Sequence, residues 1–177
     1  MKKNLAVIIV LALVILGLVT AAAIYLWPVR IDRETDGILY RANLPSYSEE
    51  MVLRMDGSYF RKPFSDNEFL GIFHIDGIDL PDNLNPEGNV NIHFDKNGQG
   101  GLFYMSPETA EWYSIGTVYF DLRSQKITVA IFEDAGTGSG DWSSAGGLIF
   151  SAPSQDRGEA VEITNELLDY VLIKPIK

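Results

Sequence analysis

The sequence predicts a mainly β protein, either an antiparallel sandwich or a partly closed barrel of about eight strands, with one C-terminal amphipathic helix and one N-terminal transmembrane helix. Three observations support this prediction: an apolar run over residues 5–26, alternating apolar and polar residues after residue 51, and a single helical stripe after residue 156. The sequence leaves the sandwich and the barrel both open.

The apolar run begins at Leu5 and is long enough to cross a membrane. As a helix, residues 5–26 would extend about 33 Å, which matches a hydrocarbon core of about 30 Å. Trp27 follows at a position where aromatic side chains settle at the membrane interface. We therefore expect residues 1–4 to be cytoplasmic and residues 5–27 to form a signal anchor whose partner is the lipid bilayer.

The charges beside this run predict its orientation. Lys2 and Lys3 precede it without an acidic residue, whereas Arg30 and Arg33 alternate with acidic residues. The positive-inside rule then places the rest of the chain outside the cytoplasm, as a single-pass protein of the cell membrane. The alternative is a signal peptide cleaved near Ala23, which would secrete the domain.

The exported part is strongly acidic and contains no cysteine. Residues 31–177 include 11 basic and 24 acidic residues, a net charge of −13. Such a domain has no basic cluster for phosphate contacts, so we expect no nucleic-acid partner, and its surface should be repelled by anionic lipids. Without disulfides, the hydrophobic core must supply the stability.

Residues 28–50 are interpreted as a linker that contains one short strand, at residues 38–40. The extracytoplasmic β domain then occupies residues 51–177. A single domain of this length can bury a substantial core.

The domain is expected to open with a tight hairpin. Asp56 and Gly57 tolerate the positive φ of a type I′ turn, which places strands at residues 51–55 and 58–62. A longer strand is expected at residues 68–76.

Two further hairpins follow from alternation of apolar residues with period two. The first has residues 95–100 as its loop, and the second has residues 123–126. The expected cross-strand pairs are Phe94 with Gly101, Ile92 with Phe103 and Val90 with Met105 in the first hairpin, and Phe120 with Val129 and Val118 with Ile131 in the second.

The sequence of the C-terminal third predicts a loop, then a strand and then a helix. Residues 134–147 are rich in Gly and Ser, and residues 148–152 are apolar on both faces, which is typical of a central strand. Asp156 predicts a helix start, followed by an apolar stripe. A last short strand is expected at residues 170–173.

The best candidate ligand contacts in the sequence are Trp142, Asp134, Asp141 and His93. An indole can stack on a sugar ring while carboxylates accept its hydroxyl groups, and His93 is expected on a half-exposed strand face. The simpler interpretation is a solvent loop with Trp142 folded onto the core.

No strong motif for catalysis, a metal or a cofactor is present. Glu133 with Asp134 and Asp141 could serve an acid-dependent hydrolase, but acidic residues are abundant throughout. The segment at Asp95 resembles the start of a calcium loop without its closing bidentate acid, so a hairpin turn is the better interpretation. His74 and His93 have no cysteine or close histidine to complete a zinc site, and we expect no metal, no cofactor and no catalytic residue.

Three segments resemble membrane-anchored extracytoplasmic proteins of Gram-positive bacteria that have no assigned activity. They are MDGSYFRKPF, GIFHIDG and LIFSAPSQDR, within residues 50–165. The resemblance implies a location and no site. We therefore expect a non-catalytic, membrane-anchored β domain that acts as an envelope accessory or contacts a ligand, with an envelope glycan or protein as partner. The alternatives are a barrel that binds a small apolar or sugar ligand at the membrane surface, and an envelope hydrolase.

Overall fold

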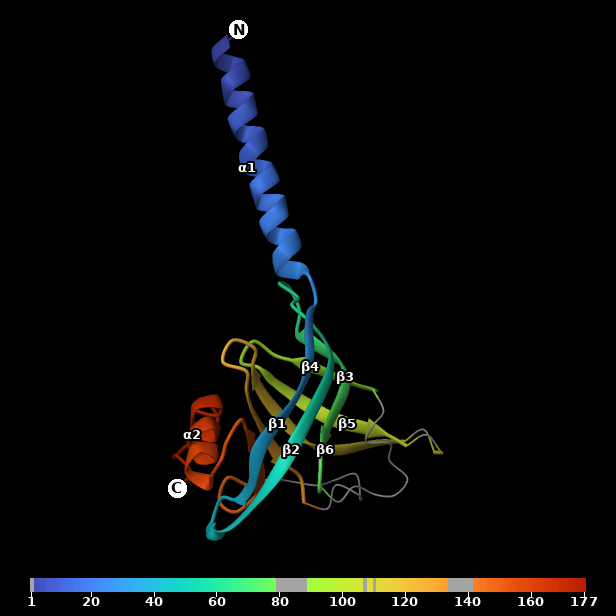
Figure 1. The fold of residues 1–177 in the computed structure, drawn as a ribbon, viewed down its shortest axis with the longest axis vertical. Helices are drawn as coiled ribbons and strands as arrows, with labels where there is room; N and C mark the ends of the chain where they lie inside the picture. The colour runs from blue at the N-terminus through green and yellow to red at the C-terminus, as the bar shows by residue number, and fades with distance from the viewer. Residues whose placement is uncertain (1, 79–88, 107, 110, 134–141) are drawn as a thin grey trace.

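The computed structural model describes residues 2–78, 89–106, 108–109, 111–133 and 142–177. In this part of the chain a long N-terminal helix projects from a β-barrel, and a shorter helix lies against the side of the barrel (Figure 1). The elements are α1 (Lys2–Leu26), β1 (Val29–Arg41), β2 (Leu44–Phe60), β3 (Asn67–Ile75), β4 (Asn89–Phe94), β5 (Gln99–Met105), β6 (Trp112–Asp121), β7 (Lys126–Ile131), β8 (Leu148–Ala152) and α2 (Arg157–Leu167).

The N-terminal helix has the length and composition predicted from the sequence. Its segment Ile9–Leu26 is apolar enough to cross a membrane, and none of it is buried against the rest of the protein. A helix of this kind is compatible with a membrane anchor or with a signal sequence.

The eight strands form a nearly closed antiparallel barrel. Their order is β4-β3-β2-β1-β8-β7-β6-β5, so strands adjacent in sequence are paired except at the seam between β4 and β5, and β8 returns to pair with β1. The two strands at the ends of this order also lie side by side, and the Asp95 N–H donates to the Gln99 carbonyl at 2.9 Å. The structure therefore selects the barrel over the sandwich.

The inside of the barrel is filled with side chains. Tyr59, Phe94 and Phe120 form an aromatic cluster with ring centroids 5.7 to 5.9 Å apart. Deeper in the core, a cavity of about 10 Å³ lies beside His74. It has room for no more than a water molecule.

The second helix covers the outer face of β7 and β8, which explains why these strands are buried on both faces. Beneath it, the Tyr40 hydroxyl donates to the Thr164 hydroxyl at 2.6 Å. The Ser151 hydroxyl lies 2.7 Å from the Thr164 hydroxyl. Burial raises the pKa of Tyr40 to about 12. As predicted, Asp156 caps the helix, and its carboxylate accepts the Glu159 N–H.

Residues 28–50 are not a linker, because they contain β1 and the beginning of β2. Only Trp27 and Pro28 separate the end of α1 from the first strand. The predicted turn at Asp56 and Gly57 is also wrong, since both residues lie inside β2, where Gly57 pairs with Gly71 of β3. The glycine is needed here because the two strands approach closely: a Cβ at Gly57 would lie 2.4 Å from the Leu70 carbonyl oxygen.

The hairpin around Asp95 forms, but β5 is shifted by one residue from the predicted register. The Asp95 carboxylate accepts the N–H groups of Asn97 and Gln99, which ends the loop early. Because side chains alternate, a one-residue shift exchanges the faces of the strand. As a result Leu102 and Tyr104 are buried, whereas Phe103 and Met105, predicted to face the core, are exposed.

The second hairpin has the predicted faces with a register shifted by two residues. Phe120 pairs with Ile127, and Val118 pairs with Val129. A shift of two residues keeps each side chain on its face, so the same residues reach the core.

The last predicted strand, at residues 170–173, is absent, because this segment is turn and coil. Nearby, Asn165 of α2 holds the backbone of Ile176 through two hydrogen bonds.

Candidate ligand site at the mouth of the barrel

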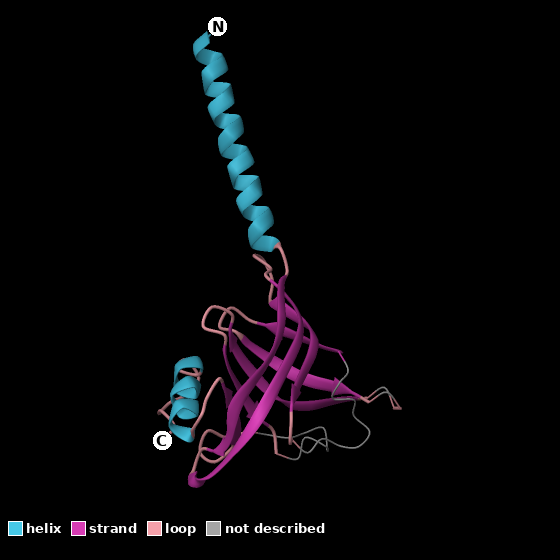
Figure 2. Cartoon of the chain, in the orientation of Figure 1, coloured by secondary structure: helices cyan, strands magenta, loops and turns pink. Residues whose placement is uncertain are grey.

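One end of the barrel adjoins the foot of α1. Only two residues separate α1 from β1, so β1 starts at this end of the barrel. Because successive strands alternate in direction, the connections at residues 61–66, 95–98 and 122–125 lie at the same end. Figure 2 shows strand connections at the foot of the helix. We call this end the helix-proximal mouth.

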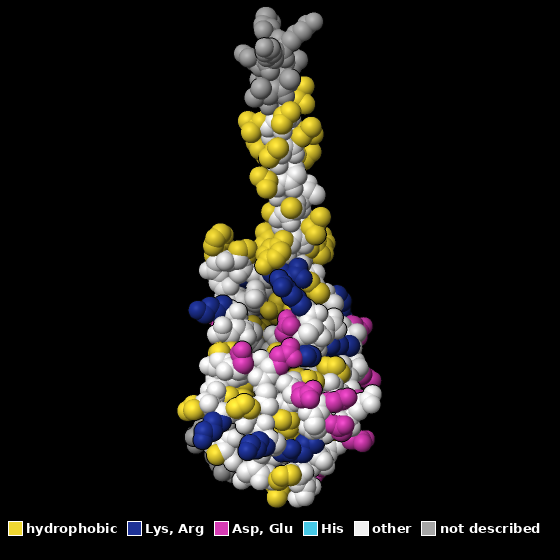
Figure 3. Space-filling view, turned by 90° about the vertical axis from the view of Figure 1, so that its left-hand side faces the viewer, with side chains coloured by type: hydrophobic (Ala, Val, Ile, Leu, Met, Phe, Trp, Pro, Cys, Tyr) yellow, Lys and Arg dark blue, Asp and Glu magenta, His cyan; other side chains and the backbone are white. Residues whose placement is uncertain are grey.

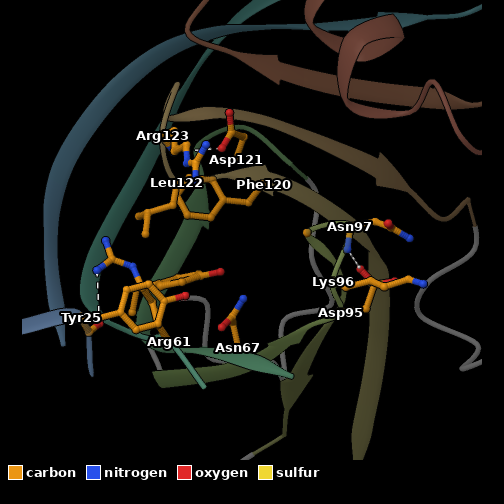
Figure 4. Close-up of a pocket in the computed structure, with 12 residues that line it drawn as sticks. Tyr25, Arg61, Asn67, Asp95, Lys96, Asn97, Phe120, Asp121, Leu122 and Arg123 are labelled. Carbon is orange, nitrogen blue, oxygen red and sulfur yellow. Dashed lines mark hydrogen bonds between the residues drawn. The ribbon is translucent and has the colours of Figure 1, made fainter. Parts of the chain in front are cut away.

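The helix-proximal mouth encloses a cavity of about 710 Å³. Tyr59 and Phe120, from the aromatic cluster of the core, line it beside more polar residues. Figure 4 shows that its walls come from four separate parts of the chain. The lining residues are Tyr25, Tyr59, Arg61, Asn67, Asp95, Lys96, Asn97, Gly98, Phe120, Asp121, Leu122 and Arg123.

Arg61 is the half-buried cation of this cavity. It follows the last residue of β2, and its guanidinium lies 5.5 Å from the centre of the Tyr25 ring (Figure 4). It donates one long hydrogen bond, of 3.4 Å, to the Tyr25 carbonyl oxygen. A guanidinium has five N–H donors, and Arg61 forms no ion pair with any described residue, so most of its donors remain available to a ligand.

The two carboxylates in the lining are already engaged in turns. Asp95 accepts two backbone N–H groups, as described above, and Asp121 accepts the N–H groups of Arg123 and Ser124 and the Ser124 hydroxyl. Burial raises the pKa of Asp121, but these hydrogen bonds outweigh it and hold the pKa below its usual value. Both Asp95 hydrogen bonds go to Oδ1, and neither carboxylate forms an ion pair with Arg61.

The rim adds two more basic side chains. Lys96 and Arg123 lie on exposed loops, and neither forms an ion pair with a described residue. In Figure 4 the Lys96 side chain extends away from the centre of the cavity, so Arg61 is the cation best placed to contact a ligand inside it. Figure 3 shows Lys and Arg side chains gathered where the helix meets the domain. The arrangement can bind a small anion whose apolar part rests on Tyr59 and Phe120.

Of the site residues predicted from the sequence, the two that the structure describes, Trp142 and His93, are absent from the lining of this cavity. Asp134 and Asp141 lie outside the described residues. Trp142 packs against two clusters of buried apolar residues beneath and beside α2, which include Ala160 and Leu168, as the simpler interpretation expected. His93 is exposed on β4, four strands away from β8 in the order of the sheet. Trp142 and His93 therefore belong to different faces of the barrel.

The remaining candidates are also separate from one another. His74 pairs with Asp76 at 3.0 Å and lies six residues along β3 from Glu68, the cross-strand partner of His93. At about 3.3 Å per residue this places the two histidines about 20 Å apart. Glu133 forms an ion pair with Arg41. Within the described residues, no group of three acidic or histidine side chains could hold a metal ion.

The sequence carried one overlooked signal of this site, the segment RKPF at residues 61–64. Two basic residues, a proline and an aromatic residue between two strands are unusual in an acidic domain, and Phe64 is fully exposed. The other lining residues come from loops far apart in sequence, which only the closed barrel brings together. Comparisons with protein-family models, curated proteins and solved structures find no match, so the assignment of this site rests on its own geometry.

Proposed function

We propose that the chain is a single-pass membrane protein whose barrel stands on the outer face of the membrane and binds a small anionic ligand in the helix-proximal mouth. The observation that supports this most directly is Arg61, a half-buried cation that forms no ion pair within the described part of the chain, beside a cavity of about 710 Å³. The orientation follows from Lys2 and Lys3 before the helix. The role is binding, without catalysis by the ligand site.

The chemistry of the lining favours an anion over a cation or a neutral molecule. A carboxylate or phosphate can accept two parallel N–H groups from a guanidinium, and such charge-assisted hydrogen bonds are stronger than neutral ones. A cation would be repelled by Arg61, and its attraction to Asp95 and Asp121 is reduced because both carboxylates already accept turn hydrogen bonds. The net charge of −13 opposes anion binding elsewhere on the domain surface, so we expect it only at the mouth.

An apolar ligand held inside the barrel is a weaker proposal, because the aromatic cluster fills the space below the mouth. Both proposals place a small molecule at the membrane surface. Tyr59 and Phe120 give the mouth an apolar base, and polar residues surround them. The apolar base alone would not discriminate between ligands of different charge.

We expect the full chain, purified in a non-ionic detergent, to bind one molecule of phenyl phosphate in native mass spectrometry. Phenyltrimethylammonium, of similar size and opposite charge, should bind much more weakly. Leu122→Trp should reduce the phenyl phosphate adduct by about tenfold or more, because Leu122 is a half-exposed lining residue and an indole there would fill the cavity.

Leu44→Trp is the matched control, since Leu44 is exposed at the opposite end of the barrel and should leave binding unchanged. Near-UV circular dichroism should show that both variants remain folded. Equal binding of the two probes, or full phenyl phosphate binding by folded Leu122→Trp, would contradict the proposal.

A further inference from the structure

A second, apolar groove lies beside the mouth. It has a volume of about 390 Å³ and is formed by one face of the end of α1 together with the start of β1. Arg61 lines this groove as well as the cavity in the mouth, so the two spaces share a wall. The groove is lined by Thr20, Ala23, Ile24, Trp27, Pro28, Val29 and Arg61.

The groove belongs to the segment that is apolar enough to span a membrane. From Thr20 to Trp27 the helix rises about 10 Å, so the groove would run from the hydrocarbon region of the outer leaflet up to the membrane interface. The mouth would then open at the level of the lipid headgroups, because only two residues separate α1 from β1. An apolar space and an anion-binding space would meet at Arg61, at the boundary between hydrocarbon and water.

We infer that the anionic ligand of the mouth is a membrane amphiphile, such as an anionic phospholipid, with its phosphate at Arg61 and a hydrocarbon chain in the groove. This inference rests on the proposed function and specifies its ligand. The phosphate accepts N–H groups of the guanidinium, while the hydrocarbon chain lies in a groove lined mainly by apolar residues.

The groove favours a ligand from the bilayer over a free anion. A net charge of −13 opposes free anions and anionic headgroups alike, so it does not distinguish the two sources. A lipid reaches the mouth by lateral diffusion along the foot of α1, where Lys and Arg side chains are gathered (Figure 3). The groove also adds apolar contacts that a free phosphate cannot make.

The test uses the full chain in nanodiscs of phosphatidylcholine with about one third phosphatidylglycerol, released into non-ionic detergent and measured by native mass spectrometry. The wild-type chain should retain one phosphatidylglycerol and discriminate against phosphatidylcholine. Ala23→Phe, which fills the groove, and Leu122→Trp, which fills the mouth, should each reduce the retained lipid by about tenfold. Free glycerol phosphate should bind at least about tenfold more weakly than the lipid.

Ala22→Phe is the control for the groove, because Ala22 is absent from the groove lining and lies on the opposite side of α1. If Ala23→Phe retained the lipid as the wild type does while Leu122→Trp lost it, the amphiphile would be wrong and the anion site would stand. Glycerol phosphate binding as tightly as the lipid would overturn the inference in the same way. If phenyl phosphate also failed to bind, the proposed function itself would be wrong.

Discussion

Gly71→Ala is expected to lower the free energy of unfolding by about 3 kcal/mol, or about 10 °C in Tm for a domain of this size. Gly71 of β3 pairs with Gly57 of β2 inside the barrel wall. An added Cβ would lie 2.3 Å from the Asp56 carbonyl oxygen and 2.4 Å from the Gly57 Cα. Both are backbone atoms, so they cannot move aside as a side chain would, and the strands would have to separate.

The measurement is thermal unfolding of the full chain in detergent, followed by near-UV circular dichroism. Gly158→Ala is the matched control, because an added Cβ there meets only one carboxylate oxygen, at 3.1 Å, at the start of α2. Its effect should stay within about 1 kcal/mol. A Tm for Gly71→Ala within about 2 °C of the wild type would show that β2 and β3 do not approach as closely as described.

Arg61→Gln is expected to weaken phenyl phosphate binding by about tenfold to hundredfold, since charge-assisted hydrogen bonds contribute about 1.5 to 3 kcal/mol. Arg61→Lys should retain part of the affinity, because an ammonium keeps the charge without the planar pair of donors. The fold should tolerate both changes, because Arg61 is half-exposed and donates only one long hydrogen bond. Binding to the wild-type chain should also weaken as salt is added.

Arg54→Gln is the control for this prediction. Arg54 lies on β2, seven residues before Arg61, and its side chain is exposed and absent from the lining of the mouth. Native mass spectrometry with phenyl phosphate should show the wild-type adduct for this variant. Equal losses for Arg54→Gln and Arg61→Gln would indicate a general charge effect and would contradict a specific anion site.

Long or strongly patterned segments were predictable from the sequence. The apolar length of α1, the two-sided burial of β8 and the cap at Asp156 each depend on residues close together in the chain. The core faces of β4 and β6 also follow from their alternation. Local periodicity is sufficient for such elements, because it describes which side of one element is buried.

Register and turn position were harder to predict, because the same sequence is compatible with more than one register and more than one turn position. Asp56-Gly57 is a common turn sequence, yet here the glycine permits close contact between strands in a long, bent β2. In β5, the turn held by the Asp95 carboxylate shifts the register of the strand by one residue. The strand has apolar residues on both faces, so its sequence pattern is compatible with either register. Hydrophobic pattern alone cannot correct a register when both faces are apolar.

The candidate site was not predictable because it depends on closure of the barrel. Tyr25, Arg61, Asp95 and Phe120 are separated by tens of residues and meet only because the strands alternate around one axis. The candidate residues in the sequence stood out by their side-chain chemistry and local sequence context, such as Trp142 in a Gly-rich segment. Their chemistry was plausible, but the structure places Trp142 against the core beside α2.

The proposed function and the inferred ligand both require that the helix-proximal mouth faces the bilayer, and a label at Phe64 can measure this directly. This residue is fully exposed on the loop between β2 and β3, beside Arg61 and Lys62. The chain has no cysteine, so Phe64→Cys accepts a single fluorescent label of the nitrobenzoxadiazole type, and Leu44→Cys at the other end of the barrel serves as its control.

Both labelled proteins would be measured in nanodiscs with and without spin-labelled lipids. We expect the label at Phe64 to emit at shorter wavelength and to be strongly quenched by the spin-labelled lipid, because the proposed orientation places this loop at the membrane interface. The label at Leu44 should emit as in water and remain unquenched. Equal, water-like emission from both positions would contradict a mouth that faces the membrane, and with it the amphiphile inferred for the site.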